Sequence, residues 1–188
     1  MNVGFAFLII LFVMHINNGN LSKKILSWYD NNKRILPWRL SQNSNKKQYY
    51  RILSEFMLQQ TQVKTVIPYF NNFVKKVPNL KALSNCKEKK ILKLWEGLGY
   101  YRRAKNLHKT SKILIKKYNG QIPKSFTKLK ELPGIGDYTA NVLLALIYNQ
   151  PRVALDGNVK RVLTRLFNIN TKNTENLFKT KRNGDLAE

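Results

Sequence analysis

The sequence predicts an all-α fold. From Leu21 onward, Val, Ile and Leu recur at three- and four-residue spacing, which is the period of an amphipathic helix. No long run of alternating apolar and polar residues indicates a strand, and we find no internal repeat. Apolar residues make up 43% of the 188-residue chain, which is enough for a substantial core and too many for a disordered protein.

Glycine, proline and polar clusters divide the chain into its expected elements. Pro37 stiffens a loop over residues 34–39, residues 97–99 interrupt the helical pattern, and Gly120 and Pro123 end a long basic helix. Residues 171–188 are polar and weakly patterned. We expect helices over residues 21–32, 49–60, 63–76, 79–85, 88–95, 101–118, 125–132, 137–148 and 156–168.

The charge of the chain is strongly positive. Lys and Arg number 34 and Asp and Glu number 10, which gives a net charge of +24. Nucleic acid is the leading partner for such a chain; the alternatives are an anionic membrane surface, or an AT-rich genome that enriches Lys. The one cysteine, Cys86, excludes a disulfide framework, a zinc site and a cysteine-ligated cluster within these residues, so we expect no metal site.

Residues 5–14 form an apolar run that is too short to span a bilayer. The run has the length of a signal-peptide core, but no basic residue precedes it and no clear small-x-small cleavage site follows it. A start codon assigned too far upstream, with the true start near Met14, fits equally well. We therefore expect a cytoplasmic protein without a membrane partner, with a signal peptide as the minor alternative.

The segment Leu-Pro-Gly-Ile-Gly-Asp at residues 132–137 lies between two expected helices. Its glycines allow positive φ, and the free N–H groups of the next helix suit a phosphate. Together with Ala140, this run is the signature of a helix-hairpin-helix element; an ordinary helix–helix turn is the alternative. Such a hairpin binds the DNA backbone and carries no sequence information. Its expected phosphate contacts are Gly134, Ile135 and Gly136.

Acidic residues are scarce, so the position of Glu55 is informative. On a helical wheel this carboxylate shares one face with Arg51, Gln59 and Gln62. Periodicity alone favours a solvated glutamate paired with Arg51. The functional alternative is a polar face lining a cleft, where uncharged amides contact bases.

Asp156 is a second candidate carboxylate, and it opens an expected helix. From sequence alone its favoured role is to cap the N-terminus of that helix. Capping is compatible with catalysis, because a capping carboxylate is held in a fixed direction.

Four segments, in this order and spacing, resemble the motif blocks of the MutY-type adenine DNA glycosylases: residues 55–63, 97–101, 132–140 and 155–161. Residues 28–30 and 36–39 agree with the same family, and the resemblance extends from Leu21 to the C-terminus. It implies the helix-hairpin-helix DNA glycosylase fold, with a six-helix barrel-type domain and an incomplete second helical domain.

The resemblance also implies a division of the chain. Members continue with a four-cysteine loop that binds a [4Fe–4S] cluster and with a C-terminal domain that reads 8-oxoguanine. Because the cluster's cysteine ligands are absent here, we expect a fragment with reduced or no activity. The implied parts are an apolar extension (1–20), a helix and loop of the cluster-side domain (21–48), a helical domain (49–155) with the hairpin at 125–148, and the truncated start of the cluster-side domain (156–188).

The resemblance assigns chemistry to particular residues. Glu55 is the general acid that protonates the departing adenine and later activates water, which requires a raised pKa in a partly dry pocket. Asp156 stays ionised and stabilises the sugar cation. Tyr138 orients Asp156 or the intermediate, and Asn158 holds the network of water and carboxylate.

The resemblance assigns binding roles as well. Gln60 and Tyr100 enter the duplex as wedges beside the lesion; core packing is the alternative for Tyr100. Lys160 and Arg161, like the cluster of Arg102, Arg103 and Lys105, are phosphate contacts or solvated charge. The adenine pocket is lined by Arg34, Trp38, Leu58 and Val63.

Two other functions remain open. Related glycosylase-lyases that resemble endonuclease III carry a nucleophilic lysine where this chain has Tyr138, and tyrosine cannot form a Schiff base. The other alternative is a non-catalytic DNA-binding module. The favoured expectation is a monomeric, monofunctional glycosylase that acts on double-stranded DNA containing adenine mispaired with 8-oxoguanine or guanine.

Overall fold

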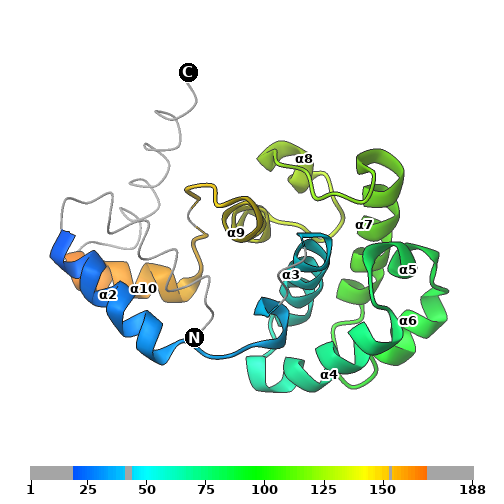
Figure 1. The fold of residues 1–188 in the computed structure, drawn as a ribbon, viewed down its shortest axis with the longest axis horizontal. Helices are drawn as coiled ribbons and strands as arrows, with labels where there is room; N and C mark the ends of the chain where they lie inside the picture. Colours follow the sequence, from blue (N-terminus) through cyan, green and yellow to red (C-terminus); the bar gives the residue numbers. More distant parts are fainter. Residues whose placement is uncertain (1–18, 41–43, 153, 169–188) are drawn as a thin grey trace. The chain divides into compact units, whose positions relative to one another are not determined.

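A computed structural model describes residues 19–40, 44–152 and 154–168. The chain divides into two compact units, Met1–Val153 and Ala154–Glu188, and each is described by itself. Every regular element in the described ranges is helical (Figure 1), which confirms the predicted all-α class.

The described helices of the first unit are coloured in chain order in Figure 1. Their bounds are α2 (Gly19–Asn32), the 3-10 turn η1 (Pro37–Arg39), α3 (Ser44–Leu58), α4 (Val63–Lys76), α5 (Leu80–Asn85), α6 (Glu88–Leu94), α7 (Arg102–Tyr118), α8 (Phe126–Lys130) and α9 (Asp137–Tyr148).

The centre of the first unit is α3, which packs against η1, α4, α7 and α9. In Figure 1 this helix lies between α9 on one side and the group of α5, α6 and α7 on the other. Its apolar residues Ile52, Leu53, Phe56 and Met57 are fully buried. Burial of each such side chain contributes about 1.5–3 kcal/mol, so the position of α3 is strongly fixed.

The start of α3 differs from the prediction. The helix begins at Ser44, five residues before the expected residue 49, because its polar first turns find distant partners. The amide of Gln48 donates to Gln121 Oε1 at 2.7 Å, and Gln48 Oε1 accepts from the Ile122 N–H at 2.8 Å. A polar helical segment held by residues more than 70 positions away gives no local signal of apolar periodicity.

The second unit contains α10 (Gly157–Phe167), which begins directly after Asp156. Ala154 and Val159 of this unit are buried. The expected helix over residues 156–168 is thus confirmed, with Asp156 as its cap rather than its first helical residue.

Among the helices in the ranges given above, none is both long and apolar enough to cross a bilayer. The apolar run at residues 5–14 and the polar segment at residues 171–188 lie outside the described residues.

Candidate active site

Glu55 lies in the interior of the first unit. Its side chain on α3 is 9% exposed, so the plain alternative of a solvated surface glutamate is wrong. Burial raises the pKa of Glu55 from 4.5 to about 7, against the opposing positive charges of Arg51 and Arg39. A carboxyl group with this pKa still holds a proton near neutral pH, which is what a general acid requires.

Two arginines share the surroundings of Glu55. Burial lowers the pKa of Arg39 to about 10, with the charges of Arg51 and Arg34 acting in the same direction. Burial also lowers the pKa of Arg51, which Glu55 and Tyr29 partly offset. The Nε atoms of Arg39 and Arg51 are buried without a hydrogen-bond partner among the described residues. From the sequence alone we expected no role for Arg39 in this site. The signal that could have indicated it is its place in the Leu-Pro-Trp-Arg segment, which agrees with the resembled family.

Because its pKa is raised, Glu55 lowers the folding stability of the chain above neutral pH. Between pH 4.5 and about 7, the folded chain retains a proton that the unfolded chain has lost, so stability falls as the pH rises through this window. We expect the gain in folding free energy from Glu55→Gln to be about 2–4 kcal/mol larger at pH 8 than at pH 4, which corresponds to roughly 5–15 °C in Tm. Thermal melts of both proteins across this range test it, and a difference in Tm that does not change with pH would contradict it.

Three of the expected adenine-pocket residues come from elements that pack together, since η1 contacts both α3 and α4, and the fourth, Arg34, lies between α2 and η1. Trp38 of η1 is 3% exposed and meets Phe70 of α4 edge-on, with ring centroids 5.3 Å apart. Leu58 and Val63 are half-buried at the end of α3 and the start of α4. Arg34 is exposed, and its carbonyl accepts from Arg39 Nη1 at 2.9 Å.

The hairpin between α8 and α9 is anchored on α3 and α7. Gly134 has φ +81°, and a Cβ there would lie 2.8 Å from Phe56 Cε1 and 2.9 Å from Asn106 Cβ. The Gly134 carbonyl accepts from Gln59 Nε2 at 3.2 Å, and the Pro133 carbonyl accepts from Thr110 Oγ1 at 2.9 Å. The packing therefore requires glycine at residue 134.

The N-terminus of α9 forms one end of the hairpin. Gly136 is the N-cap and provides no side-chain cap, and the first N–H groups of a helix lack intrahelical partners. The Asp137 carboxylate at this end is paired with the Lys130 ammonium. Ile135 is buried and its N–H donates to the Leu132 carbonyl at 3.1 Å, while Tyr138 is half-buried.

The two expected wedges share an unusual backbone. Gln60 and Tyr100 have φ values of +58° and +49°, in the left-handed region that L residues rarely adopt. Both side chains are exposed, and Tyr100 is 61% exposed, so the alternative of core packing for Tyr100 is wrong. Strained residues of this kind cluster at functional sites.

The basic cluster after Tyr101 divides into two kinds of residue. Arg102 and Lys105 are exposed, and Lys105 lies 3.9 Å from the Glu88 carboxylate. Arg103 is 7% exposed, so its interpretation as a phosphate contact or solvated charge is wrong. Its guanidinium donates hydrogen bonds to main-chain carbonyls of α3 and of the loop before α7.

In the second unit, Asp156 has the capping role that the sequence favoured. Its Oδ1 accepts from the Val159 N–H at 2.7 Å. Asn158 and Arg161 are exposed and joined by a hydrogen bond of 3.0 Å from Arg161 Nη2 to Asn158 Oδ1. Lys160 is half-buried.

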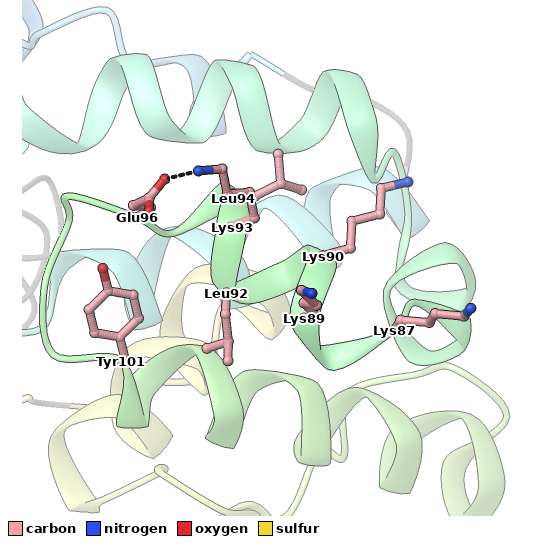
Figure 2. Close-up of a pocket in the computed structure, with 8 residues that line it drawn as sticks. All are labelled: Lys87, Lys89, Lys90, Leu92, Lys93, Leu94, Glu96 and Tyr101. Atoms are coloured by element: carbon pink, nitrogen blue, oxygen red, sulfur yellow. Dashed lines mark hydrogen bonds and ion pairs between the residues drawn. The ribbon is translucent and has the colours of Figure 1, made fainter.

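The structure also has a hollow on the surface of α6 (Figure 2). Figure 2 shows the Lys93 side chain directed at Glu96, and their Nζ and Oε2 atoms are 2.5 Å apart. None of the predicted site residues lines it, so it is not the adenine pocket. Its lining residues are Lys87, Lys89, Lys90, Leu92, Lys93, Leu94, Glu96 and Tyr101.

The residues of this chain do not fit a [4Fe–4S] cluster. The sequence contains one cysteine, Cys86, and four thiolates are needed. Within the part of the chain that the structure describes, no group of three or more His, Cys, Asp or Glu side chains could hold a metal ion.

Comparison with protein families decides the wider assignment. Residues 53–184 match the family described as the HhH-GPD superfamily base excision DNA repair protein. The chain belongs to this superfamily. The matched region includes Glu55, the hairpin and Asp156.

The superfamily relatives include adenine DNA glycosylases. One from Buchnera aphidicola subsp. Baizongia pistaciae is 49% identical over 150 residues, covering 79% of this chain and 42% of that protein. One from Mus musculus is 39% identical over 158 residues, covering 81% of this chain and 31% of that protein. These matches confirm the resemblance that the motifs predicted. The chain thus spans less than half the length of either relative.

Similarity to solved structures confirms the predicted fold. A thermostable thymine-DNA glycosylase superposes with a TM-score of 0.66 at 24% identity, covering 74% of this chain and 63% of that one. A trapped covalent intermediate of endonuclease III with DNA superposes with a TM-score of 0.65 at 23% identity, covering 79% of this chain and 67% of that one.

Proposed function

We propose that this chain carries the base-excision chemistry of an adenine DNA glycosylase, which hydrolyses the N-glycosidic bond of adenine mispaired with 8-oxoguanine or guanine. The observation that carries the proposal is Glu55, a carboxyl group buried beside two arginines with a pKa of about 7. The similarity to adenine DNA glycosylases supports the choice of base.

The proposed reaction uses two carboxyl groups. Adenine is a poor leaving group as an anion, so the protonated Glu55 donates to the base as the glycosidic bond breaks. The deoxyribose becomes a cation, which the Asp156 carboxylate stabilises, and the Glu55 carboxylate then takes a proton from the attacking water. The cap hydrogen bond to Val159 fixes the direction of Asp156. Tyr138 orients Asp156 or the intermediate, and Asn158 holds the network of water and carboxylate.

The target adenine must leave the stack before Glu55 can reach it. We propose that Gln60 and Tyr100 occupy the space it vacates, a role that their exposure supports. The extruded base then enters a pocket formed by Arg34, Trp38, Leu58 and Val63.

Backbone contacts hold the duplex during this step. The hairpin at Gly134, Ile135 and Gly136 and the basic residues Lys160 and Arg161 bind phosphates, and the charge of +24 strengthens this binding at low salt. The proposed partner is double-stranded DNA, bound by one copy of the chain, in the cytoplasm.

The proposal is tested by base release with the chain in excess over labelled duplexes. We expect slow release of adenine from A:8-oxoguanine and A:G pairs, none from A:T pairs, and no covalent adduct after borohydride reduction, because Tyr138 cannot form a Schiff base. A trapped adduct would favour the lyase alternative. Tight DNA binding without any base release would favour the non-catalytic module.

A further inference from the structure

The buried guanidinium of Arg103 joins the two turns that carry Gln60 and Tyr100. Its Nη1 donates to the carbonyls of Phe56 (3.3 Å) and Met57 (2.7 Å) and to that of Gln59. These acceptors lie at the end of α3, where carbonyls lack intrahelical partners and a positive charge is favourable.

The second amino group of Arg103 serves the other turn. Its Nη2 donates to the carbonyls of Leu98 (3.4 Å) and Gly99 (3.2 Å), and the Arg103 N–H donates to the Tyr100 carbonyl at 2.9 Å. The guanidinium carbon lies 5.3 Å from the centroid of the Tyr100 ring and 5.6 Å from that of Trp95. One side chain therefore binds two turns about 40 residues apart in sequence.

The pattern of these bonds is specific. The guanidinium holds the Gln59 carbonyl directly before Gln60 and the Gly99 carbonyl directly before Tyr100. These are the peptides whose following residues have the left-handed φ values of +58° and +49°. Because L side chains disfavour this region, such a backbone persists only where its surroundings determine it.

Arg103 is also costly to the fold. The side chain is 7% exposed, burial lowers its pKa, and its Nε has no hydrogen-bond partner among the described residues. Its binding partners are neutral carbonyls, which compensate a buried charge less well than a carboxylate. Only the planar fork of arginine matches both sets of acceptors, since lysine is a compact point charge.

We propose that Arg103 is a positioning residue that sets the backbone of both wedges and thereby controls extrusion of the target base. This inference rests on the proposed function, because it takes Gln60 and Tyr100 as the wedges. In this role Arg103 acts through the main-chain carbonyls that it binds.

The test follows base extrusion directly with 2-aminopurine in place of the mispaired adenine, since its fluorescence rises when it leaves the stack. We expect Arg103→Met to reduce the rise on binding about fivefold or more, while the Kd for the duplex changes about threefold or less. Arg103→Lys should fall between Met and the wild type. Lys109→Met is the matched control, because it removes the same charge from an exposed position of the same helix and should keep the full signal.

Several outcomes separate this inference from the proposed function. A full signal from a folded Arg103→Met protein, or full rescue by lysine, would overturn the inference alone. Loss of the helical circular dichroism signal in both variants would also overturn it, because Arg103 would then serve folding as a whole. A wild-type chain that extrudes 2-aminopurine through Arg103 but releases no adenine would support the inference and contradict the glycosylase function. A wild-type chain without any fluorescence rise would overturn both.

Discussion

Glu55→Gln should reduce the single-turnover rate constant of adenine release about 10²–10⁴-fold, the usual contribution of a general acid. Glutamine has nearly the same shape but has no acidic proton to donate to the leaving base. Since Glu55 is buried and, with a pKa of about 7, only partly ionised at pH 7, the substitution should leave affinity for mispaired DNA almost unchanged. Base release and Kd, measured on the same duplex, test both statements.

A matched control comes from the exposed carboxylate of Glu88 at the start of α6. Glu88→Gln removes a negative charge from the surface and should keep the wild-type rate constant. Equal rates for the wild type and Glu55→Gln would contradict the acid role. A collapse of DNA affinity in Glu55→Gln would show that the residue serves binding rather than chemistry.

Among glycine-to-alanine substitutions in the hairpin, Gly134→Ala should reduce the stability of the fold most. The residue has φ +81°, and the added Cβ would lie 2.8 Å from the Phe56 ring and 2.9 Å from Asn106. Left-handed strain of about 1–2 kcal/mol and overpacking of about 1–3 kcal/mol predict a loss of roughly 2–5 kcal/mol. We expect Tm to fall by roughly 5–15 °C, measured by thermal melts followed by circular dichroism.

Gly136→Ala is the control for stability. A Cβ at this position meets nothing within 4 Å, and its φ of −92° suits any residue. Its Tm should stay within about 2 °C of the wild type, whereas its DNA affinity should fall because the methyl group occupies the approach to the α9 amides. Equal stability of the Gly134→Ala and Gly136→Ala variants would contradict the packing argument.

The sequence predicted those elements whose signals are local. The helices at Val63–Lys76 and Asp137–Tyr148 have the expected bounds, since apolar periodicity and the flanking turns define both ends. The beginning of α3 could not be predicted in this way. Its first turns are polar and depend on the hydrogen bonds of Gln48 to residues that follow α7.

The same division applies to the candidate site. Motif resemblance indicated Glu55, but its helical face favoured a solvated side chain, and only the packing of η1, α4, α7 and α9 around α3 accounts for its burial. Arg103 was misinterpreted because a basic run in a chain of charge +24 looks like a DNA-contacting surface. Its partners include carbonyls 44 to 47 residues away, which no local pattern reveals.

The central claim is that a buried, protonated Glu55 drives adenine release, and the pH dependence of this reaction tests it most directly. Under subsaturating single-turnover conditions the rate reports the pKa of the free chain, which is about 7 for Glu55. The account predicts a rate that falls about tenfold per pH unit above pH 7, because the proton on the acid is lost. A rate that stays constant from pH 6 to about pH 9, well beyond that pKa, would contradict it.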